Sequence, residues 1–323
     1  MSLLRRVFLS ALAATSIGAT AQNAANWPNR ATKMIVPFPA GGGYDFMARN
    51  LALKLTESLG QPVVVENRAG ANGNIGSDMV AKSAADGYTL LLGGIGPQAF
   101  SAALYPKLPF DPQRDFAPVS LVASQPNLLL THPSLAVKTV AELVAVAKAK
   151  PGELAFGSTG SGSGQHFGLE QLKAVSGIDV IHVPYKGAAP LHTAMLGAEV
   201  KVAFNIIQLP MQHVRRGELR ALALASKKRS PLAPDVPTMT ELGYPIDFDT
   251  WYAVYAPAGT PRDIVEKLNV NILRALSDPD LKERALALGI DLIGSSPEQL
   301  RTHMRQEITR WTELSKAANI KAD

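Results

Sequence analysis

Short apolar runs alternate with helix-like amphipathic patterns along the chain, and this alternation restricts the possible folds more than any other feature. Residues 33–38 (KMIVPF) predict a strand, residues 47–60 a helix with one apolar stripe, and residues 62–67 (PVVVEN) a second strand. Residues 74–84 then predict a helix and residues 87–94 (GYTLLLGG) a third strand. Such alternation favours a parallel α/β sheet, which binds ligands beyond the carboxyl ends of its strands.

The same pattern resumes after a proline-rich connection. Residues 119–124 and 127–132 predict two strands, and Thr139 with Glu142 forms a capping-box pattern at the start of a helix. The C-terminal part predicts helices. We expect two α/β lobes joined by two crossover strands, which make a hinge with a cleft. The predicted domains are lobe 1 (27–124 plus 237–323) and an inserted lobe 2 (125–236).

Residues 1–21 have the pattern of an export signal, with an N-terminal membrane anchor as the alternative. Arg5 and Arg6 precede a short apolar stretch, and residues 19–21 (ATA) match the A-x-A cleavage pattern. The secretory and twin-arginine routes both stay open, because the arginine pair is present but Leu4 stands where Ser or Thr is usual. The expected location is the bacterial periplasm.

Composition and motifs exclude several classes of protein. A net charge of +5 over 323 residues, with "KKR" at 227–229 as the densest basic cluster, gives no reason to expect a nucleic-acid partner. The absence of cysteine excludes disulfides and thiolate sites. The six histidines have no metal-binding spacing. Residues 94–99 (GIGPQA) resemble a dinucleotide-binding pattern, but the prolines leave little room for the required helix. We therefore expect neither cofactor nor metal.

Two glycine-rich loops precede predicted helices. Residues 39–43 (PAGGG) come before a helix over 44–59, and residues 157–164 (GSTGSGSG) before one that begins near Gln165. A helix N-terminus presents unpaired N–H groups, and glycine lets an anion approach them closely. The loops are interpreted either as a two-sided anion grip or as two ordinary tight turns.

An enzyme is the less favoured interpretation of these residues. Ser158 with His166 suggests a serine hydrolase, but the chain has no G-x-S-x-G motif. No carboxylate pair suited to glycoside hydrolysis stands out either. The lack of a catalytic constellation favours a binding protein.

Long stretches of the chain resemble the Bug family, the substrate-binding proteins of tripartite tricarboxylate transporters. They begin with residues 35–93 (IVPFPAGGGYDF to YTLLLG) and continue through FGSTGSGSGQHF, VPYKGAAP, GELRALALAS, LAPDVPTMTELG and WYAVYAPAGTP in the family's order. The resemblance implies a type II periplasmic binding protein fold, with a mainly parallel sheet flanked by helices in each lobe. It also implies capture of a small organic carboxylate by hinge closure and delivery to an inner-membrane permease. We expect a monomer.

The resemblance also implies a set of ligand-binding residues. The first loop contributes main chain, and the ends of later strands contribute the rest. The expected residues are Phe38, Ala40, Gly41, Gly42, Tyr44, Asp45, Gly93, Gly94, Ser158, Thr159, Gly160, Ser163, Tyr185, Lys186, Gly187 and Asn205. Lys186 is expected either to pair with the ligand or to lie at the cleft rim.

Two departures from the family pattern bear on the ligand. Gly43 and Tyr44 replace a usual Pro-Thr or Pro-Ser pair, so that Tyr44 either lines the cleft or packs on the helix. Asn205 replaces an aspartate that meets the ligand ammonium in amino-acid-binding members. The amide can donate hydrogen bonds to an anion. This favours a di- or tricarboxylate without an amino group, such as an aliphatic or phthalate-type diacid. The alternative role for Asn205 is that it only caps the end of its strand. The alternative function for the whole protein is a sensor that binds the ligand and docks to a signalling receptor.

Overall fold

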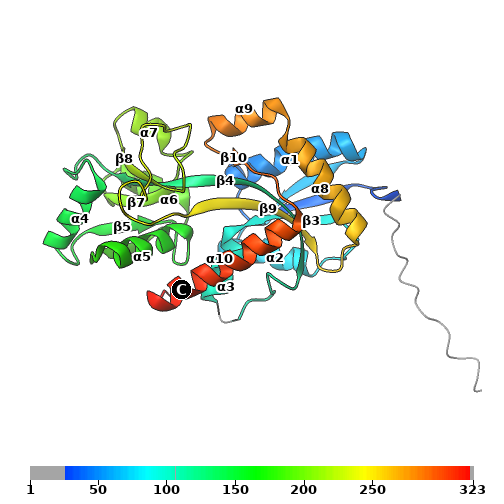
Figure 1. Cartoon of the computed structure of the whole chain (residues 1–323), viewed down its shortest axis with the longest axis horizontal. Helices are drawn as coiled ribbons and strands as arrows, with labels where there is room; N and C mark the ends of the chain where they lie inside the picture. The colour runs from blue at the N-terminus through cyan, green and yellow to red at the C-terminus, as the bar shows by residue number, and fades with distance from the viewer. Residues whose placement is uncertain (1–25, 106, 321–323) are drawn as a thin grey trace, which may run out of the picture.

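The computed structural model describes residues 26–105 and 107–320, and two lobes lie side by side in it (Figure 1). The predicted export signal at 1–21 lies outside these residues. One continuous sheet runs through both lobes in the order β2-β1-β3-β9-β4-β7-β5-β6, and β8 and β10 also pair with β4. The predicted α/β class is therefore confirmed.

Lobe 1 is built from both ends of the described chain. Its elements are β1 (Thr32–Val36), α1 (Gly43–Leu59), β2 (Val63–Asn67), η2 (Ala71–Gly73), α2 (Asn74–Ala81), β3 (Thr89–Gly94), η3 (Gly96–Phe100), α3 (Ser101–Leu104), β9 (Asp249–Pro257), α8 (Arg262–Leu276), α9 (Pro279–Ala287), β10 (Asp291–Leu292) and α10 (Pro297–Ala317). Buried side chains of α1 and α8, among them Leu51 and Leu268, belong to one apolar cluster. Helix α9 contributes Leu281 and Ala285 to the same cluster, so α8 and α9 complete lobe 1.

Lobe 2 is formed by the middle of the chain. Its elements are α4 (Val140–Ala149), β5 (Ala155–Ser158), α5 (Gly164–Ser176), β6 (Ile181–Pro184), α6 (Ala188–Leu196), β7 (Val202–Ile206), α7 (Met211–Arg215) and β8 (Arg220–Ala225). As the capping-box pattern predicts, the Thr139 hydroxyl accepts the Glu142 N–H. The Glu142 carboxylate, however, accepts the N–H of Lys138, one residue before the cap.

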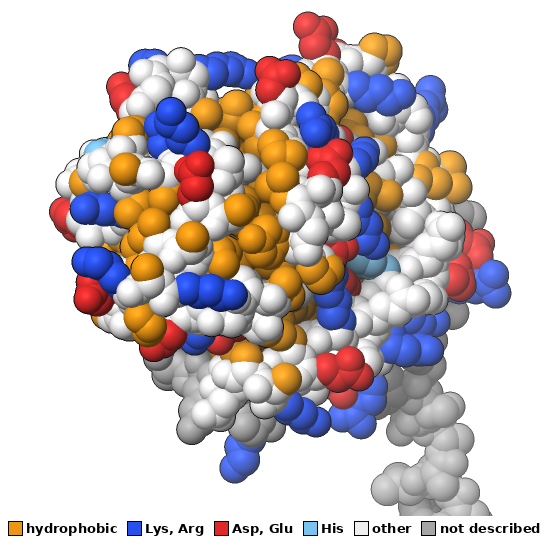
Figure 2. All heavy atoms as spheres, turned by 60° about the vertical axis from the view of Figure 1, so that its left-hand side comes forward, with side chains coloured by type: hydrophobic (Ala, Val, Ile, Leu, Met, Phe, Trp, Pro, Cys, Tyr) orange, Lys and Arg blue, Asp and Glu red, His pale blue; other side chains and the backbone are white. Residues whose placement is uncertain are grey.

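In Figure 2, where the left-hand side of Figure 1 comes forward, basic and acidic side chains are interspersed rather than gathered by sign.

Strand β4 (Phe116–Thr131) passes through both lobes. The prediction of two separate strands at 119–124 and 127–132 was wrong. The ladder of β4 with β9 ends at Pro126, opposite Asp249, and its ladders with β7 and β8 begin at Asn127. Because proline has no N–H to donate, it is tolerated where the strand changes partners.

Strand directions bring the carboxyl edges of the two lobes to face each other. Strand β9 is antiparallel to both β3 and β4, so β4 leaves lobe 1 at the edge where β1, β2 and β3 end. In lobe 2, β4 is antiparallel to β7, and β5 and β6 run parallel to β7. These three strands therefore end where β4 enters lobe 2. The carboxyl ends of both sets of parallel strands point toward the boundary between the lobes.

The helices that follow β3 and the C-terminal helix also lie close to that boundary. Helices η3 and α3 follow β3 directly, with Pro97 in the first turn, and end at Leu104, so this segment is short, as the prolines led us to expect. Helix α10 packs across both lobes, because the Trp311 ring lies 4.9 Å from Phe100 of η3 and 5.3 Å from Phe167 of α5. The Phe100 and Phe167 rings are stacked 4.6 Å apart, so the lobes also touch each other directly.

Candidate functional site

The first glycine loop joins β1 to α1 at the carboxyl edge of lobe 1. Gly41 and Gly42 are exposed, and no side chain caps the first turn of α1. Gly41 has a φ of +88°, a conformation that favours glycine. The exposed main chain at a helix N-terminus therefore has the arrangement expected for binding an anion.

The side chain of Asp45, in the first turn of α1, fixes the conformation of this loop. Its carboxylate accepts hydrogen bonds from the Gly41 N–H (3.1 Å), Arg49 Nε (2.9 Å) and Asn67 Nδ2 (3.0 Å). Burial by itself raises the pKa of the Asp45 carboxyl, but the bonds from Arg49, Gly41 and Asn67 outweigh burial and hold that pKa below its usual range. Asp45 is thus ionised at neutral pH and fixes the loop conformation.

Replacing Asp45 with alanine is expected to lower the free energy of unfolding at pH 7 by about 3 kcal/mol, because charge-assisted hydrogen bonds contribute about 1.5–3 kcal/mol each. The lowered pKa means that this stabilisation is present above the ordinary pKa of aspartate and disappears as pH falls through the value in the folded protein. Urea unfolding at neutral and acidic pH measures both effects.

The matched control for this substitution is Asp280→Ala, which removes an exposed i,i+4 pair with Arg284 at 2.7 Å. Such pairs contribute less than about 0.5 kcal/mol. Equal losses of stability in the two variants would contradict the role assigned to Asp45.

Tyr44 packs inside lobe 1. Its ring lies 4.2 Å from Phe38 and 4.5 Å, edge-on, from Tyr252, and its hydroxyl is 3.5 Å from the Trp251 carbonyl. Burial, followed by the neighbouring Tyr252 and Tyr255, raises the pKa of Tyr44 well above its ordinary value. The packing alternative for Tyr44 is the one that these contacts favour, and Phe38 remains half-buried beside it.

Gly93 and Gly94 end β3 and are both buried. The Gly94 N–H donates to Gln98 Oε1 at 2.8 Å. A Cβ on Gly94 would lie 2.1 Å from the Trp251 carbonyl oxygen, so no larger residue fits without moving β9 away from β3. This close approach is a structural reason for glycine at position 94.

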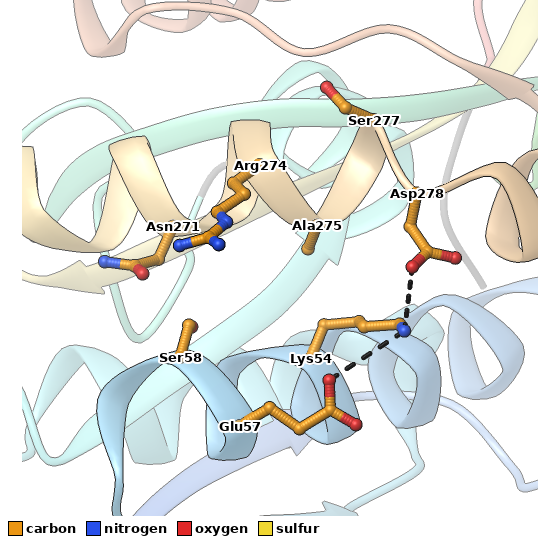
Figure 3. A pocket seen from close by; sticks show the side chains of 8 residues that line it. All are labelled: Lys54, Glu57, Ser58, Asn271, Arg274, Ala275, Ser277 and Asp278. Carbon is orange, nitrogen blue, oxygen red and sulfur yellow. Dashed lines mark ion pairs between the residues drawn. The ribbon is translucent and has the colours of Figure 1, made fainter.

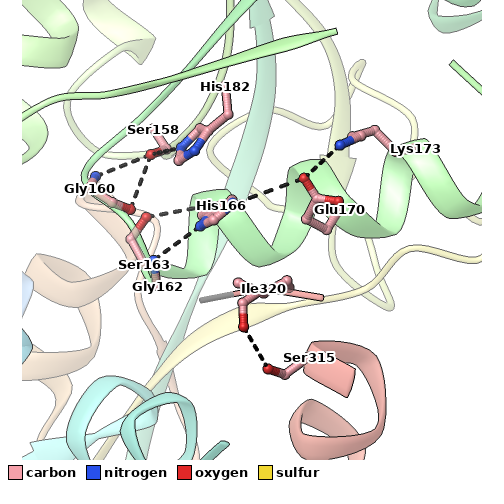
Figure 4. Close-up of polar contacts among 10 residues, drawn as sticks. All are labelled: Ser158, Gly160, Gly162, Ser163, His166, Glu170, Lys173, His182, Ser315 and Ile320. Atoms are coloured by element: carbon pink, nitrogen blue, oxygen red, sulfur yellow. Dashed lines mark hydrogen bonds and ion pairs between the residues drawn. The ribbon is translucent and has the colours of Figure 1, made fainter. Parts of the chain in front are cut away.

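In lobe 2, the hydroxyls of the second glycine loop are engaged in a local network (Figure 4). Ser158 Oγ lies 2.6 Å from His182 Nε2 and accepts the Gly160 N–H at 3.2 Å. Ser163 caps α5 by accepting the His166 N–H. The serine that the enzyme interpretation pairs with His166 is thus paired with His182.

Thr159 connects this loop to the strands that cross between the lobes. Its hydroxyl donates to Gln165 Oε1 (2.7 Å), and Gln165 Nε2 donates to Asn127 Oδ1 (2.9 Å). Asn127 Nδ2 in turn donates to the carbonyl of Phe248, just before β9 (3.2 Å). A continuous hydrogen-bond chain therefore links the second loop to both crossover segments.

The ends of β6 and β7 complete the carboxyl edge of lobe 2. The N–H groups of Tyr185 and Gly187 donate to the carbonyls of Ser158 and Thr159. These bonds tie the loop after β6 to the second glycine loop. Gly187, with a φ of +109°, precedes α6, whose first turn has no side-chain cap. Tyr185 is half-buried and Lys186 is exposed.

Asn205 is the most informative polar side chain of this edge. It is fully buried, and its Oδ1 accepts the N–H of Ile206 at 2.9 Å. Its Nδ2 is buried without a hydrogen-bond partner. An unsatisfied buried donor costs about 1–3 kcal/mol, so Asn205 has an unused hydrogen-bond donor at this edge.

A cavity of about 510 Å³ lies elsewhere, between α1 and α8 (Figure 3). It is at the end of α1 opposite to the glycine loop. Its Lys54 already pairs with Asp278 at 2.8 Å and lies 3.8 Å from Glu57. This surface groove therefore does not belong to the facing edges. Within residues 26–105 and 107–320, His, Asp and Glu side chains form no cluster of three or more suited to a metal ion.

A model of the tripartite tricarboxylate transporter family receptor matches residues 47–320. The chain belongs to this receptor family. BugT of Bordetella pertussis is 43% identical over 93% of this chain and 92% of its own length. An R. palustris protein solved with adipate has a TM-score of 0.85 and 36% identity over 92% of this chain and all of its own. MatC from Rhodopseudomonas palustris with bound malate has a TM-score of 0.80 and 33% identity over 89% and 99% of the two chains.

These comparisons confirm the predicted Bug-type resemblance and the two-lobed binding-protein fold. Members of the receptor family are periplasmic solute-binding proteins. None of the helices described for this receptor is both long and apolar enough to cross a bilayer.

Sequence reasoning missed the residues that hold the receptor's loops. Asn67 ends β2 at the same carboxyl edge, and a polar residue at that place was a usable signal. Asn127, Gln165 and His182 gave no comparable signal, because the Asn127–Phe248, Gln165–Asn127 and Ser158–His182 bonds each span 24 or more residues.

Proposed function

We propose that this receptor captures a small di- or tricarboxylate without an amino group, aliphatic or phthalate-type, between its two lobes and delivers it to a tripartite tricarboxylate transporter. The observation that carries the proposal is the buried, unpartnered Nδ2 of Asn205 at the edge of lobe 2 that faces the glycine loop of lobe 1. The relatives solved with adipate and malate support the same ligand class.

One ligand carboxylate is assigned to the main chain of residues 40–43. The uncapped first turn of α1 supplies N–H donors and a partial positive charge, and the exposed glycines let the anion come close. Asp45 and Tyr44 act behind this surface, by fixing the loop and packing against it. Several charge-assisted hydrogen bonds, less the cost of association, give roughly micromolar to nanomolar affinity.

The other end of the ligand is assigned to lobe 2. Asn205 Nδ2 donates to it, with main chain from residues 159–160 and 185–187 around it. A neutral amide cannot form the ion pair that an ammonium group requires, so aspartate and glutamate leave their charged amine unpaired. The ligand thereby bridges the lobes, and its differential affinity stabilises the closed arrangement.

The hinge is assigned to the crossings of β4 and β9. Gln125 and Asn127 lie on either side of Pro126, where β4 changes partners, close to the predicted lobe boundary. The Thr159–Gln165–Asn127 chain connects this hinge to the second loop, so that ligand contact at the loop is coupled to the crossing strands.

A calorimetric panel at neutral pH tests the ligand class. Adipate, malate, succinate, phthalate and citrate are compared with aspartate and glutamate. We expect the strongest member of the first group to bind at least tenfold more tightly than either amino acid. Tighter binding of aspartate or glutamate than of every amine-free acid would refute the role given to Asn205.

Delivery and the rival roles need separate experiments. Uptake of the bound acid by vesicles that contain the permease supports transport, whereas docking to a receptor domain favours the sensor alternative. The hydrolase alternative is disfavoured by the complete burial of Ser158, which keeps its hydroxyl from a substrate, and not by the 2.6 Å contact with His182 Nε2, which a nucleophile and its base would also make. Ester hydrolysis that disappears in Ser158→Ala would revive it.

A further inference from the structure

A second cavity, of about 150 Å³, lies beside the hinge rather than at the facing edges. Trp251 and Asp249 of β9 line it together with His303 of α10, and Lys227 reaches it from the segment after β8. Leu121 and Ser124 of β4 line it as well, so the cavity is bordered by both lobes and by both crossover strands.

Asp249 occupies a special position in this cavity. It is the first residue of β9 and pairs with Pro126, where β4 passes from one lobe to the other. Its Oδ1 is buried without a hydrogen-bond partner. Burial, then the nearby Asp291 and Asp247, raise the pKa of Asp249 to about 7, although Lys227 and Lys228 lower it.

The charged groups around Asp249 come from every neighbouring segment. Asp247 accepts from Arg310 of α10 at 2.6 Å and lies 4.0 Å from Lys227, and Asp291 of β10 pairs with Lys228 at 3.2 Å. Glu307 of α10 accepts the indole N–H groups of Trp251 and Trp311. His303 has a buried Nε2 without a partner, and burial lowers its pKa. The nearby acids thus already have partners, and a charge on Asp249 has none.

We propose that Asp249 makes the hinge sensitive to pH: its neutral carboxyl favours the present arrangement of the lobes, and its ionisation weakens that arrangement. The Phe100–Phe167 contact joins the lobes in the present arrangement, so weakening it separates the two edges. Carboxylate capture is then stronger at mildly acidic than at mildly alkaline pH. This last consequence rests on the proposed function, whereas the movement of the hinge does not.

The direction follows from linkage. A carboxyl whose pKa is raised in one arrangement disfavours that arrangement at every pH above its ordinary value, and the penalty is complete once pH exceeds the raised value. The free-energy penalty on the present arrangement therefore grows as pH rises to about 7 and is complete above that value.

The hinge is tested without ligand by a distance measurement between spin labels at Ala84→Cys in lobe 1 and Ala145→Cys in lobe 2. Both positions are exposed, and the chain has no other cysteine. We expect the label distance to increase between about pH 5.5 and pH 8.5, and to stay at its acidic value in Asp249→Asn. Asp235→Asn, which removes an exposed carboxylate, should behave as the unsubstituted protein.

Affinity for adipate is measured between about pH 6.5 and 8.5, where both of its carboxylates are ionised. We expect a several-fold loss of affinity over this range, at most tenfold per pH unit, and none in Asp249→Asn. A pH-independent label distance, or a pH response that His303→Gln removes and Asp249→Asn keeps, overturns the proposal. If adipate and the other acids do not bind but the label distance responds as expected, the proposed function fails and the hinge inference stands.

Discussion

Replacing Gly94 with alanine is expected to destabilise the protein by about 3 kcal/mol or more, which is at the upper end of the usual range for a single substitution. The added Cβ would lie 2.1 Å from the Trp251 carbonyl oxygen and 2.7 Å from the Tyr44 hydroxyl. The first of these atoms belongs to the backbone of β9, so no rotation of a side chain relieves the clash. Thermal and urea unfolding measure the loss.

Gly42→Ala is the matched control for Gly94→Ala. Gly42 has a φ of −91°, and a Cβ there meets no atom within 4 Å. Its alanine variant should unfold within about 0.5 kcal/mol of the unsubstituted protein. Equal stability of Gly94→Ala and Gly42→Ala would contradict this prediction, because β3 and β9 would then have to lie far enough apart to hold a Cβ at position 94.

The alternation of strands and helices was sufficient to predict the fold class, because each pattern depends on local periodicity. The single strand β4 was beyond this reasoning. Pro126 and the polar residues around it interrupt the apolar pattern, and only pairing with β9, more than a hundred residues later, shows that the strand continues. The same long-range pairing brings the edges of the two lobes to face each other.

The glycine loops could be located from the sequence because glycine before a helix has a local physical meaning. The supports of these loops could not. Asp45 was expected at the ligand, yet its oxygens are used by Gly41, Arg49 and Asn67. The Gln165–Asn127 bond spans 38 residues, and no local pattern reports a contact of that range. The positions of the loops are thus predictable from a local pattern, whereas the side chains that shape them are not.

Asn205→Asp is expected to reduce affinity for adipate by about 100-fold, which corresponds to about 2.7 kcal/mol. The substitution preserves shape and the acceptor for the Ile206 N–H, but it replaces the buried, unpartnered Nδ2 with a charged oxygen. Like charges placed together in a desolvated site cost several kcal/mol. The same variant should bind aspartate or glutamate more tightly than the unsubstituted receptor does, since the new carboxylate can pair with an ammonium group.

Two further variants separate charge at the ligand from other consequences of the substitution. Asn205→Ala removes the donor without adding charge and should lose about tenfold in affinity. Asn271→Asp adds the same charge at the outer groove between α1 and α8 and should leave affinity within twofold. Calorimetry is paired with thermal unfolding, so that only folded protein is counted. An Asn205→Asp receptor that stays folded and binds adipate as before would show that Asn205 does not contact the ligand, and the polarity of the site would then have to come from main chain alone.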